Sequence, residues 1–262
     1  MGFFDLFKKK SSTDNNKKQV LLAMPMFNNF ETFDLNKLVE HLKNEWSLEI
    51  INLNGGNGTA SFQLDRELVV LGTVSHQIPW EEIQATASIS YNWDTAEKDL
   101  KNHNVHVIVS IMSSNKSTLE RFLLLTKLLA SILATTNCIG IYHGTQGLLI
   151  PKNQYLESAQ NLKMNQLPIE IWVYFGLLKS ENCNHGYTKG LTSFGKLEME
   201  MVNSQRDIEE IGLFLMNATN YVIANNIQFK SGQTLGYTAD QKIKITQSIG
   251  HLVQGDSIKL EI

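Results

Sequence analysis

Apolar residues recur along the chain in two distinct patterns. Continuous apolar runs such as Val20–Met24 and Val105–Met112 are typical of buried strands. A spacing of three to four residues, clearest over 117–134, predicts amphipathic helices. The predicted helices cover 31–45, a segment that begins at Pro79, another that begins at Asp94, 117–134, 153–163 and 206–226. The predicted strands cover 20–24, 48–53, 60–64, 67–74, 105–112, 138–142, 169–175, one or two strands in 187–202, and short strands around Leu235, Ile243–Ile245 and Ile258–Ile262.

The order of these elements predicts an α+β fold. The first half reads β-α-β-(β)-β-α-α-β and the second β-α-β-β-α-β-β, and each resembles a split β-α-β of the ferredoxin-like type with added strands. We therefore expect mostly antiparallel sheets covered by helices. Residues 19–262 are expected to form a single domain of two pseudo-repeated halves, 19–134 and 135–262, preceded by a tail over 1–18.

The first ten residues are a basic amphipathic stub. Its apolar and basic side chains are Phe3, Phe4, Leu6, Phe7, Lys8, Lys9 and Lys10. Such a stub is suited to weak contact with an anionic membrane surface, and the alternative is a frayed terminus. The apolar run is too short to span a bilayer, and Leu6 stands where a myristoylation signal needs Ser or Thr. Residues 11–18 are interpreted as a linker.

Composition limits the classes of partner. The 262 residues are 42% hydrophobic, which is enough for a sizeable core, and the formal net charge is only −3. The chain has three arginines, Arg66, Arg121 and Arg206, spaced far apart, so we expect no nucleic-acid partner. Two cysteines make no disulfide framework and there is no secretory signal peptide, so a cytoplasmic location is expected.

Metal and nucleophile motifs are weak. Only His103 and His106 lie close together among the histidines, and no HExxH or paired CxxC motif is present, so we expect neither a metal nor another cofactor. No Gly-x-Ser-x-Gly elbow occurs. Cys138 and His143 are five residues apart, which places them about 16 Å apart on an extended chain. Cys138 is therefore interpreted as a structural thiol.

Segments of the second half carry a family resemblance. They are IYHGTQG at 141–147, LPIEIWV at 167–173, TKGLTSFGKLEME at 188–200, SGQTLG at 231–236 and KIKI at 242–245. Residues 138–262 thereby resemble the bacterial DUF4261 family of unknown function. The chain departs from the family's pattern at His143, at Gln233 and near 248–250. The resemblance implies a stand-alone cytoplasmic protein, some of whose relatives are associated with secretion or toxin–immunity loci, and it implies no activity or catalytic residue.

Strand faces supply the candidate binding residues. Glu198 and Glu200 share one face of a strand with side chains about 7 Å apart, and Glu170 and Trp172 share a face of another. His143 follows a buried strand and precedes a glycine-bearing loop, a place where functional groups are often presented. The candidate set is His143, Glu170, Trp172, Glu198 and Glu200. If the strands are neighbours, these side chains form an acidic, aromatic-walled concavity; the alternative is a solvent-facing sheet surface balanced by Lys189 and Lys196.

These features predict a non-catalytic binding protein. We expect it to engage a protein partner through the acidic and aromatic strand face, and its concrete form is an immunity or regulatory protein against a secreted toxin or effector. The alternative is a small-molecule-binding protein or enzyme with a pocket between the halves near His143, Glu198 and Glu200. The sequence does not set the oligomeric state.

Overall fold

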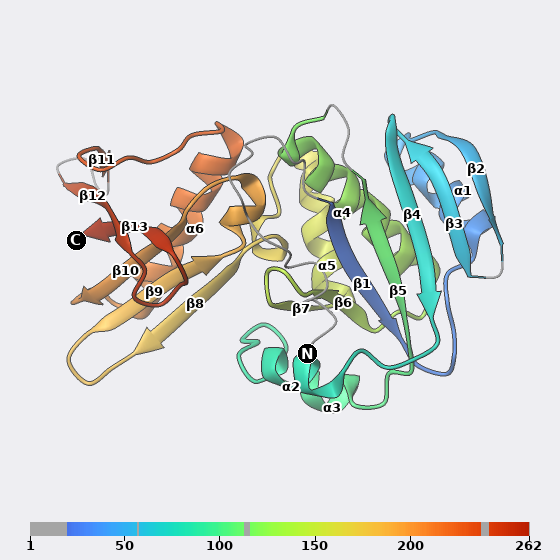
Figure 1. Ribbon diagram of the computed structural model, residues 1–262, viewed down its shortest axis with the longest axis horizontal. Coiled ribbons are helices and arrows are strands. Elements are labelled where there is room, and N and C mark those ends of the chain that lie inside the picture. The colour runs from blue at the N-terminus through green and yellow to red at the C-terminus, as the bar shows by residue number, and fades with distance from the viewer. Residues whose placement is uncertain (1–19, 57, 113–115, 237–240, 262) are drawn as a thin grey trace. The chain divides into compact units, whose positions relative to one another are not determined.

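The structure is a computed structural model that describes residues 20–56, 58–112, 116–236 and 241–261. The chain divides into two compact units, Met1–Met164 and Asn165–Ile262. Each unit holds one mostly antiparallel sheet with helices packed on it, as Figure 1 shows, so the predicted α+β class is confirmed. The amphipathic stub over residues 1–10 lies outside the described residues.

The first unit is built on a seven-stranded sheet in the order β2-β3-β4-β5-β1-β6-β7. Its strands are β1 (Leu21–Phe27), β2 (Ile50–Gly56), β3 (Thr59–Leu64), β4 (Glu67–Val74), β5 (Val105–Ile111), β6 (Gly140–His143) and β7 (Leu148–Pro151). Its helices are α1 (Leu35–Trp46), α2 (Trp80–Ala87), α3 (Ala96–Leu100), α4 (Thr118–Thr135), α5 (Lys152–Gln160) and the 3₁₀ turn η2 (Asn161–Met164). Both β5 and β6 pair antiparallel with β1, so β5-α4-β6 is a split β-α-β with β1 between its parallel strands.

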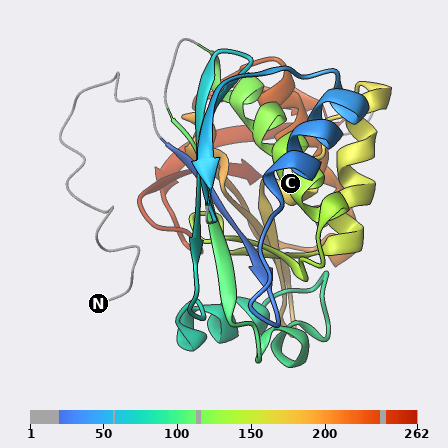
Figure 2. The ribbon, with the colours of Figure 1, turned by 90° about the vertical axis from the view of Figure 1, so that its right-hand side faces the viewer.

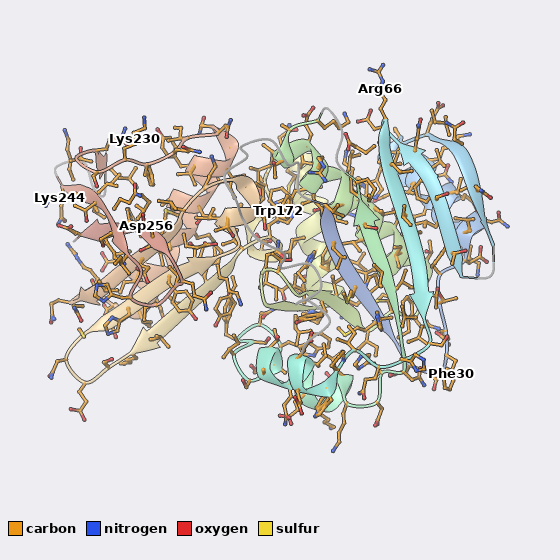
Figure 3. The ribbon with its side chains drawn as sticks, in the orientation of Figure 1. Phe30, Arg66, Trp172, Lys230, Lys244 and Asp256 are labelled. Atoms are coloured by element: carbon orange, nitrogen blue, oxygen red, sulfur yellow. The ribbon has the colours of Figure 1, made fainter. Side chains whose placement is uncertain are left out.

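Alternation along the strands gives this sheet two unlike faces. In β3 and β4 the buried positions alternate with exposed or half-buried ones, since successive side chains point to opposite faces. Helices α1, α4 and α5 lie together on the buried face, seen in Figure 2 as the blue, green and yellow helices on one side of the sheet. Asp65 and Arg66 join β3 to β4 with positive φ at both residues, as a tight hairpin requires, and Arg66 points away from the sheet in Figure 3.

Helices α2 and α3 cover only part of the other face. Met24, Met26, Tyr142 and Leu149 of the sheet form a core cluster with Ile78, Ile83, Trp93, Ala96 and Leu100 of the α2–α3 region. Pro79 stands at the N-cap of α2, which agrees with the start predicted from the sequence. The cluster therefore closes the sheet near β6, β7 and the second half of β1.

The second unit holds a six-stranded sheet in the order β11-β12-β13-β10-β9-β8. Its strands are β8 (Tyr174–Lys179), β9 (Asn184–Lys189), β10 (Glu198–Ser204), β11 (Thr234–Gly236), β12 (Lys242–Ile249) and β13 (Asp256–Glu261). Its helices are the 3₁₀ turns η3 (Ile169–Ile171) and η4 (Leu191–Phe194) and the helix α6 (Ile208–Ala224), which packs on β8 and β9. Here β10 and β13 are parallel direct neighbours, and α6, β11 and β12 lie between them in the chain. No strand separates β10 from β13 in the sheet, so the split β-α-β predicted for this half is not found among its described strands.

Two segments differ from the sequence expectation. The strand predicted over 169–175 is the turn η3 followed by β8, because Ile169, Ile171, Trp172 and Val173 are all buried and do not alternate between two faces. The hairpin of β6 and β7 pairs with β1, so residues 140–151 extend the first sheet and the first unit ends later than the predicted division at residue 134.

Candidate functional site

Glu198 is a buried anchor for a turn of the second unit. Its side chain accepts hydrogen bonds from the Thr188 hydroxyl at 2.8 Å and from the backbone N–H groups of Gly190, Leu191 and Thr192 at 2.8–3.2 Å. Both carboxylate oxygens are used, and the residue is only 6% exposed. Glu198 therefore holds the start of η4 against β9.

Glu200 does the same for the loop between β12 and β13, and it is fully buried. Its donors are the backbone N–H groups of His251, Leu252 and Val253, the hydroxyl of Ser257 and the ammonium group of Lys259. Burial opposes ionisation of this carboxyl most strongly, but the bonds from Lys259, Ser257 and the backbone outweigh burial and lower the pKa of Glu200 to about 2. Glu200 is thus a buried carboxylate that stays charged.

The prediction of a solvent-exposed acidic and aromatic face is therefore wrong. Glu198 and Glu200 do share one face of β10, but that face points into the protein, where charge-assisted hydrogen bonds compensate for their burial. Trp172 is 1% exposed and packs on Phe194 of η4, with 6.0 Å between ring centroids. Glu170 lies half-buried in η3 and not on a strand. The alternative reading, a solvent-facing surface balanced by lysines, is wrong for the same reason.

His143 lies at the end of β6 in the first unit and is 2% exposed. Its ring stacks on that of Tyr155, with 6.3 Å between centroids, and its Nε2 has no hydrogen-bond partner. Burial lowers the pKa of His143 to about 4, so the ring is neutral at pH 7. The alternative of a reactive pocket near His143, Glu198 and Glu200 gains no support, because the histidine is enclosed and the carboxylate oxygens are already bound.

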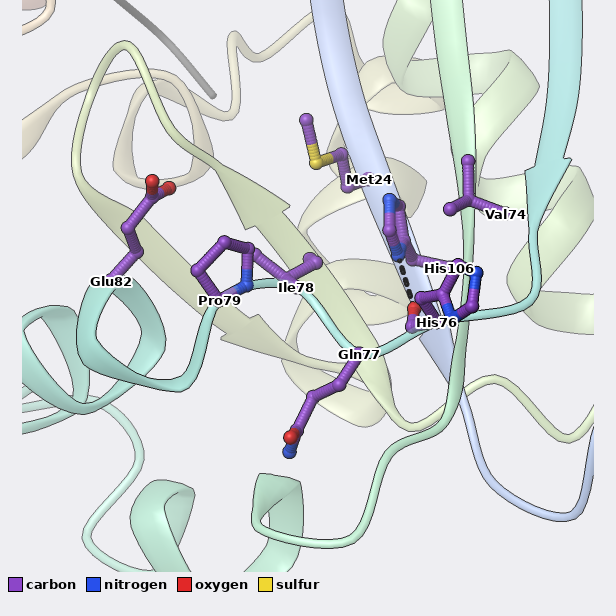
Figure 4. Close-up of a pocket in the computed structure, with 8 residues that line it drawn as sticks. All are labelled: Met24, Val74, His76, Gln77, Ile78, Pro79, Glu82 and His106. Atoms are coloured by element: carbon purple, nitrogen blue, oxygen red, sulfur yellow. Dashed lines mark hydrogen bonds between the residues drawn. The ribbon is translucent and has the colours of Figure 1, made fainter. Parts of the chain in front are cut away.

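A small pocket of about 230 Å³ lies in the first unit beside the segment that leads into α2. Figure 4 shows its lining: Met24, Val74, His76, Gln77, Ile78, Pro79, Glu82 and His106. The His106 Nδ1–H donates to the His76 carbonyl at 2.9 Å, and burial lowers the pKa of His106. No hydroxyl, thiol or amine nucleophile is part of this lining, and within the described ranges no group of three or more His, Cys, Asp or Glu residues is placed to hold a metal ion.

The part of the first sheet that α2 and α3 leave uncovered is an apolar surface. We call it the open face and define it by five residues that are each more than a third exposed: Val20, Ile51, Leu68, Val70 and Met112. Ile51 is paired with Gln63, Gln63 with Leu68, and the Met112 N–H donates to the Leu68 carbonyl, so these positions form a row across β2, β3, β4 and the end of β5. Val70 lies in the next row, opposite Ser61 and Ser110.

No charged side chain belongs to these two rows. The positions between the apolar residues are Gln63, Ser61 and Ser110, and the half-buried Leu22 pairs with Ser110 on β1. Exposed sheet surfaces usually carry polar or charged side chains in this alternation. Large apolar patches on a soluble protein mark interaction surfaces more often than isolated apolar residues do. The open face is therefore the candidate functional site that the geometry favours.

Comparison with known proteins identifies one part of the chain. Residues 187–261 match the family described as "Domain of unknown function (DUF4261)". This confirms the resemblance over β9 to β13, the part of the second unit that contains Glu198, Glu200 and their donors. Comparison with curated proteins and with solved structures finds no match. Among the helices of the described ranges, none combines the length and apolar character that crossing a membrane requires.

Sequence reasoning missed two features. The run Leu68-Val69-Val70-Leu71 was predicted as part of a strand, but its exposed side was not recognised: Leu68 and Val70 are exposed, while Val69 and Leu71 are buried. The pair Cys183 and His185 was also overlooked, although residues two apart on a strand face the same side. In both cases the signal was the two-residue period of a strand.

Proposed function

We propose that this protein is a non-catalytic binding protein and that its open face engages a protein partner. The proposal rests on the exposed apolar side chains of the open face, which lie on β2 and β4, just after β5 and just before β1, with no charged side chain among them. The buried cores of protein interfaces are depleted in charged residues and rich in apolar area, as this row is. A nucleic acid needs basic groups at the contact, and none of these positions supplies one.

The size of the open face suits the centre of an interface. Four strand spacings along a row, and two rows that are two residues apart, give distances between the outermost side-chain positions on the order of 19 Å by 7 Å. Stable complexes bury about 800 Å² on each partner, so this surface is the apolar centre and neighbouring polar residues form the rim. A flat sheet surface of this kind favours a macromolecular partner over a small ligand, which needs a concave pocket.

The partner segment that fits best is an amphipathic helix. The opposite face of the same sheet is covered by α1, α4 and α5, and α2 and α3 cover the neighbouring part of the same face. A helix laid on the open face would complete this arrangement, with its apolar stripe on Leu68, Val70 and Met112. The helix would need little charge along the contacting stripe, because the open face offers no ion-pair partner.

We further propose a cytoplasmic regulatory or immunity role, in which binding neutralises a toxin or effector. Cys138 and Cys183 are both free thiols, which supports a reducing compartment. The match to DUF4261 carries no activity, so the role rests on the binding surface and not on the family.

The test is co-purification of a stoichiometric partner from the native cell with the wild-type chain and two variants. Val70→Lys places a charge in the open face, while Met164→Lys changes a 62% exposed residue in η2, away from it. We expect Val70→Lys to lose the partner, because an unpaired charge is buried at the contact, and Met164→Lys to retain it. Equal capture by both variants, or no stoichiometric partner with the wild type, contradicts the proposal.

A further inference from the structure

Cys183 and His185 form a contact pair at the beginning of β9. The Cys183 Sγ lies 3.4 Å from the His185 Nε2, and its S–H donates to the Asn203 Oδ1 at 3.7 Å. The side chains of Cys183 and His185 are both half-buried. The turn between β8 and β9 is fixed, because the Ser180 N–H donates to the Cys183 carbonyl at 2.9 Å and the Gln205 side chain donates to the Asn182 carbonyl at 3.0 Å. The thiol and the imidazole are thus held on a closed, hydrogen-bonded turn.

The neighbouring strand determines which nitrogen of His185 carries the proton. The pairing of β9 and β10 shifts between Met201 and Ser204, and within this bulge Asn203 adopts a positive φ of 55°. The Asn203 backbone N–H then donates to the His185 Nδ1 at 3.2 Å. Because Nδ1 must keep its lone pair to accept this bond, the neutral ring carries its proton on Nε2, which faces the sulfur.

We infer that Cys183 is a reactive thiol that undergoes exchange with small-molecule disulfides, and that His185 is its positioning residue. The Nε2–H is in place to stabilise negative charge on the sulfur, and the thiolate is the form that attacks. In the exchange, the Cys183 thiol proton goes to solvent and the sulfur attacks one sulfur of the disulfide. A new S–S bond forms, the old one breaks, and the other half leaves as a thiolate. The disulfide is the oxidant, so electrons balance without a further reactant.

Cys138 provides an internal control in the same chain. It is 2% exposed, its S–H donates to the Gly140 carbonyl at 3.3 Å, and burial raises the pKa of its thiol to about 12. A buried, protonated thiol does not attack disulfides. The chain therefore contains one cysteine expected to react while folded and one expected to be inert.

The experiment measures mixed-disulfide formation with glutathione disulfide, by mass spectrometry of both cysteine peptides, in the folded and in the denatured full-length protein. We expect folded Cys183 to react about threefold to tenfold faster than the same thiol in the denatured chain, because the Nε2–H contact exists only in the fold. Folded Cys138 should remain unmodified. A folded rate for Cys183 equal to or below its denatured rate overturns the inference, because mere exposure gives that result.

Variants distinguish a positioning role of His185 from a merely structural one. His185→Ala should lower the folded rate of Cys183 to that of the denatured chain, and His185→Gln should restore part of it by supplying an amide N–H donor. His251→Ala removes another imidazole of the same unit and should change nothing. If His185→Ala retains the wild-type rate, or His185→Gln and His185→Ala are equally slow while folded, the assigned role of His185 is wrong.

Discussion

At the scale of single residues, the buried carboxylates explain the interior of the second unit better than they explain a function. Glu198 and Glu200 each bond several backbone N–H groups of a turn or loop, and in this way they fix chain segments that have little regular structure. Their i, i+2 spacing predicted a shared face correctly. The sequence did not show which way that face points, because a Glu with enough donors is stable where an apolar residue is usual.

Glu200→Gln is predicted to destabilise the second unit by about 3–5 kcal/mol. The change leaves the buried Lys259 ammonium without its counter-charge and replaces an oxygen acceptor by an amide donor facing other donors. Urea unfolding monitored on the second unit measures the effect. The matched control is Glu261→Gln in the exposed pair with Lys244, which should cost less than about 1 kcal/mol. Similar losses for both variants would show that Glu200 is not a buried anchor.

The pH dependence of stability should divide between the two units. His143 has its pKa lowered from 6.5 to about 4 by burial, so its unfolded form binds a proton first and the first unit loses stability as pH falls from about 6.5 to about 4. Glu200 has its pKa lowered from 4.5 to about 2, so its contribution is complete above about 4.5 and is lost as pH falls towards 2.

The contribution of His143 to the pH dependence of stability is the difference between the wild type and His143→Leu. Because His103 and His106 are also buried and have lowered pKa values, both proteins should lose stability in acid, but the wild type should lose about 3 kcal/mol more between pH 6.5 and 4. Unfolding free energies of the first unit across this range measure the difference. Parallel profiles for the two proteins would contradict it.

At the scale of elements, periodicity and end signals predicted most of the fold. The face of α4 and its start at Ser117 are both evident in the sequence, and the structure shows a capping box between Ser117 and Glu120. The turn η3 was missed because Ile169, Ile171 and Val173 are spaced two residues apart, as on one face of a strand. The sequence does not show that Trp172 between them is buried as well. The short strand β7 was missed because four residues are too few for any period to be recognised.

Ser117→Ala is predicted to weaken α4 by about 1 kcal/mol, because the N-terminal N–H of Glu120 loses its side-chain acceptor. Asp207→Ala is the control, since Asp207 occupies the N-cap of α6 without a side-chain hydrogen bond and should cost no more than about 0.5 kcal/mol. Hydrogen exchange of the amides in the first turns of α4 and α6 measures both changes. An equal effect at both caps would remove the role assigned to the Ser117 hydroxyl.

At the scale of the whole molecule, the segment that matches DUF4261 and the open face belong to different units. The DUF4261 match lies within the second unit, whereas the apolar surface belongs to the first sheet. Apolar runs predicted most strands of that surface, but the pairing of the strands decides that Ile51, Leu68 and Met112 form one row. Pairing between strands distant in sequence is set by tertiary packing, so this site was beyond reach of sequence patterns alone.

The central claim, that the open face is the partner surface, is tested most directly by methionine oxidation of the free protein and of the complex isolated from the native cell. Met112 lies in the open face and is 37% exposed, while Met164 lies in η2 and is 62% exposed. With dilute peroxide and mass spectrometry, we predict that both oxidise in the free protein and that the partner protects Met112 at least about fivefold while Met164 keeps its rate. Unchanged oxidation of Met112 in a stoichiometric complex would contradict the account.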